Sequence, residues 1–544
     1  MTLRRGNSMD TVISGGTVVD GTGGAAFKAD VGIKSGKIVK VSRSIDERSE
    51  RKIDATGMMV TPGFIDIHTH SDFTLLLNTK AESYVRQGVT TELLGACGRT
   101  CAPVRGDRTE MLAKDLVGYN PVVKITWRSF GDYLRELERL GVAHNVAAMV
   151  GHNAVRIATV GYDARGPTGS EMTEMKELVE DSMREGAFAL STGLAYPPGS
   201  SSTTEEIIEL ARVAKKHGGF YYSHLRGTDG DFLMGVEEAL RIGRETGIAV
   251  HMAHLCGFFG MNDETHKAIG MVERERREGM DVTCDLYPYT MGSSPFMSFF
   301  PQSMFEKGDE QLVKEMRDPA GRARLIEEIL ESPVGSFWLS RPETLERIRL
   351  YDCRAHPELK RKNLLEIGET MHLPALEAGL VLLADEGEGM HSVGLICEWQ
   401  KPEDNRMVFR TEFHMVGSDG AALAPYGELG TFKFHPRSYG TFPRVIGSYV
   451  REEKILTLEE AIRKMTSFPA KRMGLSDRGF IGSGAWADVV VFDYEQIRAR
   501  STFEEPDLFP AGIKNVLVNG ETVVEDGEHT GKLPGTVLRN ARAS

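Results

Sequence analysis

The sequence predicts an α/β protein built on a parallel (β/α)₈ barrel of the TIM type. A small β domain made from both chain ends and a subdomain inserted late in the barrel complete the prediction. Two observations support it. Apolar runs alternate with charged helical segments through the middle of the chain, as in βα units. Short β-branched runs separated by glycine-containing turns occupy both ends. The length of 544 residues also exceeds that of a typical single domain.

Eight apolar runs make up the predicted barrel strands: 64–70, 90–97, 145–152, 187–192, 220–224, 248–254, 281–287 and 413–419. Helical stretches such as 171–186 and 235–247 lie between many of them. The gap between the seventh and eighth runs is far longer than one crossover helix requires. It therefore predicts an inserted subdomain over most of this gap. The alternative is a doubly wound open sheet.

Both chain ends show strand patterns joined by tight turns. The N-terminal run VISGGTVVDGTG and the C-terminal run NVLVNGETVVEDGE contain Gly-Gly, Asp-Gly and Asn-Gly pairs, which are typical of hairpins. The simplest interpretation is one β domain formed by 1–62 and 481–544. The barrel then occupies 63–290 and 411–480, and the inserted subdomain occupies 291–410.

Composition restricts the possible partners and location of the protein. The formal net charge of −13 disfavours nucleic acid as a partner, because phosphate binding needs clustered Lys and Arg. No apolar run approaches the length that spans a bilayer, so no membrane partner is expected. Six cysteines in so long a chain indicate reduced thiols rather than a disulfide framework. We therefore expect a cytoplasmic protein whose partner is a small molecule rather than nucleic acid or a membrane.

The predicted strand ends carry side chains that bind metal ions: His68, His70, Cys97, His224 and His254. The C-terminal ends of barrel strands share one rim, so these side chains are expected to meet. His68 and His70 are two positions apart on a strand, and both rings point to the same side. A cysteine with two histidines is a reasonable zinc set that leaves one position open for water.

These residues also have structural interpretations. A free buried cysteine such as Cys97 often behaves as a small hydrophobe, and His224 could be a packed histidine. His251 and His254 are three apart, so only one of them is expected to point into the rim. His254 lies nearer the strand end, which makes His251 the packed or hydrogen-bonded one.

Asp419 follows the eighth apolar run and precedes a glycine. Its structural interpretation is a helix cap or turn residue. Its functional interpretation is proton transfer, because a carboxylate beside a metal site can accept a proton from water and later pass it to a leaving amine.

Several long motifs extend the argument to nearly the whole chain. They are TPGFIDIHTHSD, GHNAVR, STGLAYPPG, YYSHLRG, DLYPYTMGSS, GSDGA, HPRSYGTFPRVIG and RGFIGSGAWADVVVFD. On these motifs the chain resembles the amidohydrolase superfamily and, within it, the N-acyl-D-amino-acid deacylases (D-aminoacylases). The resemblance implies a barrel with a small β domain from both termini. It also implies zinc-dependent hydrolysis of a linear C–N amide bond, which releases a carboxylate and a free D-amino acid.

The resemblance also implies a role for individual residues. Cys97, His224 and His254 would hold one tightly bound zinc ion. His68 and His70 would form a second, weaker metal site or help orient water, and Asp419 would be the acid/base. The residues implied in substrate binding are Tyr196, Tyr289, Ser294 and Arg437, the last of these for the α-carboxylate.

The chain departs from the family pattern at one position. The family usually reads Ser-His-His-Lys around the last zinc histidine, and that lysine also faces the substrate carboxylate. Here the sequence is Ala253-His254-Leu255-Cys256. Arg437 or Arg226 could supply the missing cation. The alternatives are a related hydrolase of a cyclic amide, a carbamate or a xenobiotic amide, and a non-catalytic binding or scaffold relative. The sequence leaves the oligomeric state open.

Overall fold

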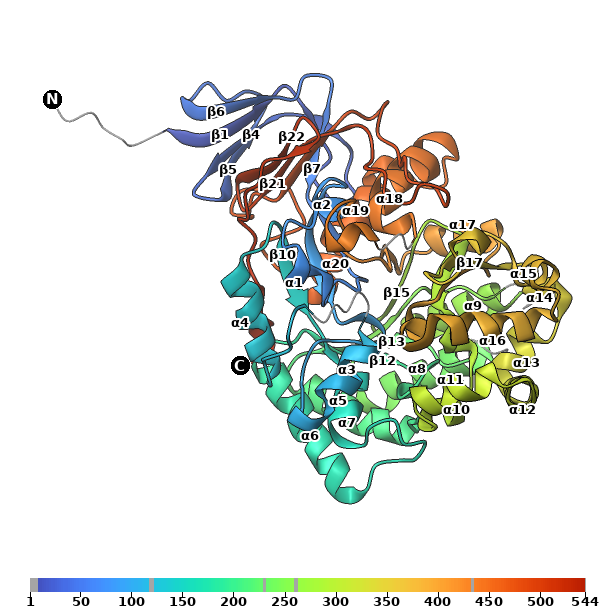
Figure 1. Ribbon diagram of the computed structural model, residues 1–544. Coiled ribbons are helices and arrows are strands. Elements are labelled where there is room, and N and C mark those ends of the chain that lie inside the picture. Colours follow the sequence, from blue (N-terminus) through green and yellow to red (C-terminus); the bar gives the residue numbers. More distant parts are fainter. Residues whose placement is uncertain (1–7, 117–121, 228–230, 259–262, 432–434, 544) are drawn as a thin grey trace.

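The computed structural model describes residues 8–116, 122–227, 231–258, 263–431 and 435–543 (Figure 1). Its centre is a barrel of parallel strands, which confirms the predicted fold class. The strands are β8 (Phe64–Asp66), β9 (Val89–Leu94), β10 (Asn145–Ala148) with β11 (Val150–Gly151), β12 (Ala189–Gly193), β13 (Phe220–His224), β14 (Val250–Met252), β15 (Val282–Leu286) and β19 (His414–Val416).

The strand order follows the chain order around the barrel. β8, β9 and β10 pair in parallel, and so do β11 through β15 and then β19. A parallel bridge between Thr69 and Gly420 joins the segments that follow β8 and β19. The first and last strands therefore meet, and the barrel closes.

Amphipathic helices cover the outside of the barrel. α6 illustrates why they form where they do: Thr168 and Glu171 build a capping box at its N-terminus, and Met175, Val179 and Met183 face the core. The covering helices are α4 (Phe130–Leu140), α5 (His152–Thr159), α6 (Gly169–Arg184), α7 (Thr204–Lys216), α8 (Phe232–Thr246), α9 (Glu264–Arg277), α17 (Pro402–Arg410), α18 (Arg437–Arg444), α19 (Leu458–Met465) and α20 (Ser467–Met473). Shorter helices lie in the first loops: α1 (Thr74–Leu77), α2 (Glu82–Val85) and α3 (Thr109–Asp115).

The small β domain contains two sheets. In Figure 1 its strands from the N-terminal segment are blue and those from the C-terminal segment are red. The first has the order β5-β4-β1-β6 and comes from the N-terminal segment alone: β1 (Met9–Ser14), β4 (Asp30–Lys34), β5 (Lys37–Ser42) and β6 (Ser49–Asp54). The second has the order β23-β22-β21-β20-β7-β2-β3. Its strands are β2 (Thr17–Val18), β3 (Phe27–Lys28), β7 (Met59–Pro62), β20 (Val489–Phe492), β21 (Ile513–Val518), β22 (Glu521–Glu525) and β23 (Glu528–His529). Because β20 pairs antiparallel with β7, with Val490 opposite Thr61, the two chain ends share one sheet.

The segment between β15 and β19 contains a separate antiparallel sheet of order β16-β18-β17 with its own hydrophobic core. The strands are β16 (Met291–Pro295), β17 (Ile348–Asp352) and β18 (Gly394–Glu398). The helices are α10 (Gln302–Glu306), α11 (Asp309–Arg317), α12 (Pro319–Glu331), α13 (Pro333–Leu339), α14 (Pro342–Leu345), α15 (Leu364–Met371) and α16 (Ala375–Glu386). The predicted insertion 291–410 also contains α17. That helix packs against α9 and β19 and so belongs to the barrel.

Within the described ranges, no single helix has the length and apolar composition to cross a membrane. Only α15 and α16, taken together as a pair bent by 80°, pass that test. Much of α16 is buried in the core of the insertion.

A buried ion pair joins the small domain to the barrel. Arg478 pairs with Asp488 just before β20, and each side chain is only 4% exposed. The other groups around Asp488 come from both domains: the Asn519 backbone amide donates to it at 2.8 Å, and the Asn145 side chain at the start of β10 donates at 3.2 Å. The Asp488 carboxylate thus links groups of the two domains.

We expect Asp488→Ala to destabilise the protein by about 3–5 kcal/mol, because it leaves the Arg478 guanidinium buried without its counter-charge. Chemical denaturation followed by circular dichroism measures the loss. Glu521→Ala is the matched control in the same domain. Its partner Lys532 is half exposed, so a change below about 0.5 kcal/mol is expected. Equal effects of the two substitutions would contradict this role of Asp488.

Candidate metal centre

Metal-binding side chains converge at the C-terminal ends of the barrel strands. His68 and His70 follow β8, Cys97 lies in the short helix η1 (Ala96–Gly98) after β9, and His224 ends β13. His254 follows β14 and Asp419 follows β19. Three of these residues, Cys97, His254 and Asp419, have positive φ angles of 55°, 32° and 52°. Such backbone is unusual for residues other than glycine and is concentrated at functional sites.

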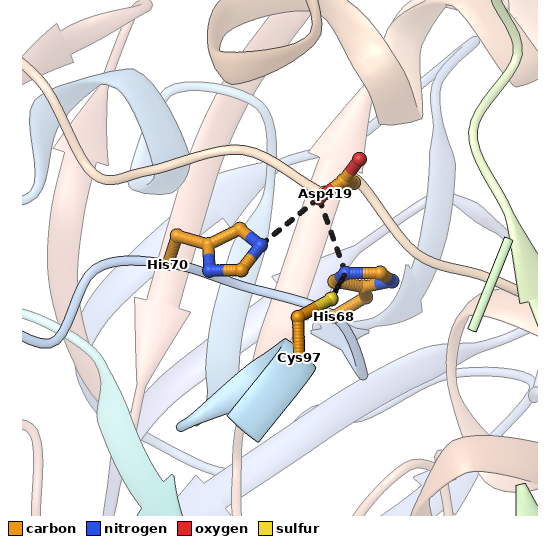
Figure 2. A group of neighbouring side chains, drawn as sticks. All are labelled: His68, His70, Cys97 and Asp419. Atoms are coloured by element: carbon orange, nitrogen blue, oxygen red, sulfur yellow. Dashed lines mark hydrogen bonds and ion pairs between the residues drawn. The ribbon is translucent and has the colours of Figure 1, made fainter. Parts of the chain in front are cut away.

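The first cluster contains His68, His70, Cys97 and Asp419. Figure 2 shows these four side chains pointing toward one another. The Nε2 atoms of His68 and His70 lie 3.1 and 3.0 Å from Asp419 Oδ1. The Cys97 sulfur lies 3.4 Å from His68 Nε2.

The second cluster contains Cys97, His224 and His254, so it shares its cysteine with the first. His254 Nε2 and His224 Nδ1 are 2.9 Å apart. In each cluster the ligand atoms lie within 4.8 Å of one another. A thiolate with imidazole nitrogens is the donor set that zinc prefers, and one or two divalent ions fit the residues present.

The electrostatics favour ionised ligands. Burial alone would raise the pKa of the Cys97 thiol, but His68, His224 and His254 around it hold that pKa well below the ordinary value. Burial would likewise raise the pKa of Asp419, and Arg437 together with His68 and His70 holds it well below the ordinary value. Metal binding needs deprotonated ligands, and this environment supplies the thiolate and the carboxylate. The same anions raise the pKa values of His68 and His70 against the effect of burial, so these rings release their protons when a metal ion binds.

Asp285, in β15, forms hydrogen bonds to one candidate ligand residue of each cluster. Its Oδ1 accepts hydrogen bonds from His68 Nδ1 at 2.8 Å and from the His254 backbone amide at 2.9 Å. Its Oδ2 accepts from the Tyr222 hydroxyl at 2.9 Å and from His251 Nε2 at 3.0 Å. Because His68 donates through Nδ1, its Nε2 atom is directed into the site, which is how a carboxylate orients a metal-binding histidine.

Sequence reasoning missed Asp285, although a signal was present. The residue interrupts the apolar run 281–287, and an aspartate inside such a run is almost never fully buried unless it is paired. His251, which was expected to be packed or hydrogen-bonded, lies in this network, with Nδ1 also 2.8 Å from the Thr283 hydroxyl.

A cavity of about 2050 Å³ opens beside the metal-binding residues. Of the residues predicted to bind substrate, Tyr196, Ser294 and Arg437 line it. Arg437 Nη1 lies 2.8 Å from Asp419 Oδ2. Sequence reasoning missed further lining residues of the same cavity: Arg99, Tyr287 and His435.

Among the described residues that line the cavity, neither Arg226 nor Tyr289 appears. The Arg226 guanidinium donates to Glu238 at 3.0 Å and to two backbone carbonyl oxygens, so local partners hold it. Tyr289 is buried and lies against Arg444, whose guanidinium is 4.9 Å from its ring. The Cys256 thiol is also buried outside the cavity, 3.6 Å from Asn405 Oδ1.

A (β/α)₈ barrel that brings histidine, cysteine and aspartate side chains to its C-terminal rim is suited to metal-dependent hydrolysis. Residues 51–317 and 417–524 match the model of the amidohydrolase family (Amidohydro_3), and the chain belongs to this family. Residues 1–64 match the model of the N-terminal domain of the urease alpha subunit.

Known relatives extend the similarity over almost the whole chain. An N-acyl-D-glutamate deacylase of Alcaligenes xylosoxydans xylosoxydans is 34% identical over 98% of this chain and 96% of its own length. The structure of an N-acyl-D-glutamate deacylase from Bordetella bronchiseptica, complexed with zinc and a phosphonate inhibitor, is 30% identical. It has a TM-score of 0.80 over 98% of this chain and all of its own. A D-aminoacylase structure with a binuclear metal centre is 32% identical, with a TM-score of 0.79 over the same shares. The resemblance proposed from sequence is confirmed.

We expect Asp285→Asn to weaken metal binding by about 10–100-fold, because the His68 ring and the His254 backbone lose the carboxylate that orients them. Competition with a chelator of known affinity measures the change. Asp163→Asn, at an exposed position, is the control and should leave the affinity unchanged. Unaltered affinity in the Asp285 variant would refute this role.

Proposed function

We propose that this protein is a zinc-dependent deacylase that hydrolyses the linear amide bond of N-acyl-D-amino acids to a carboxylate and a free D-amino acid. The observation that carries the proposal is the position of Asp419. Its carboxylate lies between two candidate ligand histidines and an arginine, and it lines a large cavity. The relatives are deacylases of N-acyl-D-amino acids, and the D configuration of the substrate rests on them.

The donor sets suggest how metal would be held. Cys97, His224 and His254 would bind one zinc ion tightly, and His68 with His70 would provide a second, weaker site. A bound zinc ion supplies Lewis acidity, which makes water nucleophilic near neutral pH. The binuclear centre described for the related D-aminoacylase supports a site with two positions.

Asp419 would move the proton. Its Oδ1 lies at about 3 Å from both His68 and His70, so it is directed toward the space where water and the amide would meet. As an ionised carboxylate it can accept the proton of the attacking water and then deliver it to the departing nitrogen. The ion pair with Arg437 keeps the carboxylate charged and fixed in position.

Arg437 and its neighbours would receive the carboxylate of the substrate. The guanidinium lies 5.1 Å from the Tyr287 ring centroid and lines the same cavity. One nitrogen faces Asp419, and the planar group presents its other donors in a fork that suits a second carboxylate. Arg437 would thereby contact both the substrate carboxylate and Asp419, the proposed proton-transfer residue.

A second candidate function rests on Cys256. Burial raises the pKa of this thiol, and the neutral side chain occupies the position where the family resemblance leads us to expect a lysine. This substitution favours an amide without an α-carboxylate, such as a cyclic amide, a carbamate or a xenobiotic amide.

The two candidates are separated by incubating the zinc-loaded protein with paired N-acetyl-D- and N-acetyl-L-amino acids, with and without a chelator. Chelator-sensitive cleavage of the D forms alone supports the deacylase. If neither enantiomer is cleaved although zinc is bound, amides that lack the α-carboxylate become the better substrates to test.

We expect Asp419→Asn to lower kcat by about 10²–10⁴-fold, because the amide cannot accept and return the proton. The tightly bound zinc ion, measured by atomic emission, should be retained, since Cys97, His224 and His254 are intact. Asp181→Asn, at an exposed helical position, is the control. Full activity in the Asp419 variant would exclude it as the acid/base.

A further inference from the structure

Arg99 is a cation that lines the cavity and has no part in the proposed mechanism. It follows η1, two residues after Cys97, and its side chain is 19% exposed. The guanidinium lies over the ring of Tyr196, 4.4 Å from the centroid, and its Nε atom is 3.5 Å from Asp115 Oδ1. Tyr196 and Asp115 line the same cavity. Stacking on one side chain and ion pairing with the other thus fix the plane of the guanidinium.

Most of the hydrogen-bonding capacity of this guanidinium is unused. The group carries five N–H donors. Its Nε atom is buried without a hydrogen-bond partner, because the approach of Asp115 makes an ion pair but not a hydrogen bond. Within the part of the chain that the structure describes, no residue accepts a hydrogen bond from either Nη group of Arg99. These donors are therefore available to a ligand in the cavity.

The nearest cation in sequence on this wall of the cavity is already engaged. Lys114, in α3, lies 2.9 Å from Asp309 Oδ2 at the start of α11. The other oxygen of Asp309 is 3.0 Å from His391 Nε2. All three residues line the cavity and form one ion-pair cluster. Arg99 differs from Lys114 in that its charge faces the cavity with free donors.

The two arginines of the cavity lie beside different ligand clusters. Arg437 pairs with Asp419 of the first cluster at 2.8 Å. Arg99 stacks on Tyr196, whose ring lies 5.0 Å from the ring of His224 in the second cluster. A substrate bound at the metal centre therefore has one arginine near Asp419 and another near His224.

The proposed chemistry orients the amide between these two arginines. Asp419 delivers its proton to the departing nitrogen, so the amine half of the substrate, with its α-carboxylate, lies on the side of Arg437. The acyl half then extends away from Asp419, toward the second cluster and Arg99. A plain alkyl chain offers no acceptor to the free donors there. A carboxylate at the end of the acyl chain would accept charge-assisted hydrogen bonds from the guanidinium.

The geometry points to Arg99 as a specificity-determining residue that binds a terminal carboxylate on the acyl group of the substrate. This inference rests on the proposed deacylase function and names its substrate class: D-amino acids whose amine carries a short dicarboxylic acyl group, such as succinyl or glutaryl. Water adds across the C–N bond, and the products are the dicarboxylate and the free amino acid, so the reaction needs no further reactant.

A matched pair of substrates tests the acyl half. N-succinyl-D-alanine and N-butyryl-D-alanine have acyl chains of equal length that end in a carboxylate and a methyl group. We expect kcat/KM to favour the succinyl compound by about tenfold or more, since hydrogen bonds to charged groups give discrimination of this size. Arg99→Met should abolish this preference, and Arg99→Lys should keep part of it. Arg139→Met, on the exposed face of α4, is the matched control and should leave it unchanged.

A second pair tests the side chain of the amino acid. N-acetyl-D-glutamate and N-acetyl-D-glutamine differ in the charge of that side chain alone. Arg99→Met should leave the ratio of their kcat/KM values as in wild type. If Arg99→Met instead abolishes a preference for glutamate, while the succinyl and butyryl compounds are cleaved equally well by wild type, Arg99 serves the side chain and the assignment to the acyl group is overturned.

A binding measurement separates this inference from the deacylase proposal. Isothermal titration calorimetry of the zinc-loaded protein with succinate and with butyrate requires no turnover. Succinate should bind about tenfold or more tightly than butyrate to wild type and to Arg139→Met, but not to Arg99→Met. Arg99→Gln removes the same charge if Arg99→Met folds poorly.

The two proposals fail in different ways. Arg99-dependent preference for succinate without cleavage of any amide supports the subsite and refutes the deacylase. Equal affinities of wild type for succinate and butyrate, together with equal kcat/KM values for the two acyl-D-alanines, overturn the subsite and leave the deacylase standing.

Discussion

The Asp285 carboxylate is the interaction on which the metal centre depends. It is fully buried, and placing an ion there costs several kcal/mol unless hydrogen bonds replace its hydration. Four donors from three neighbouring segments of the barrel do so, two of them belonging to His68 and His254. These histidines sit in different ligand clusters, so one carboxylate fixes both. Burial raises the pKa of this group, and His68 and His251 reverse the effect and hold the pKa well below its ordinary value, so the anion persists.

Closure of the barrel positions the remaining groups. The Asp419 backbone amide donates to the His68 carbonyl oxygen at 2.9 Å, and the His70 amide donates to the Gly420 carbonyl oxygen at 2.7 Å. The proton-transfer candidate and two candidate ligands thus face each other across the junction of the first and last strands. The insertion enters just before the last strand and brings its tryptophans to the same cavity. The barrel therefore supplies the candidate metal ligands and Arg437, and the insertion supplies other residues that line the cavity.

Much of this arrangement follows from local patterns. Alternating apolar runs identify the strands, and because strand ends share one rim, the pattern alone predicts that His68, Cys97 and His254 meet. The rest depends on partners distant in sequence. The sequence suggested Arg226 as a cation for the substrate carboxylate, but its guanidinium donates to Glu238 in α8. Tyr287 rather than Tyr289 faces the cavity, because loop geometry after β15 decides which of two tyrosines turns inward. The role of Asp285 needs neighbours from three segments, which no local pattern contains.

The shared sheet of the small domain has a consequence for biosynthesis. β7 pairs with β20, and more than four hundred residues of chain lie between them. On the ribosome, β7 emerges long before its partner exists, whereas the sheet containing β1, β4, β5 and β6 can form at once. One edge of β7 therefore stays open until β20 has been translated. Chains released early would carry this unpaired edge next to β8, the strand that leads to the first ligand histidines. Exposed edges promote aggregation and attract chaperones, so the pairing of β20 with β7 covers an edge that would otherwise expose the protein to both.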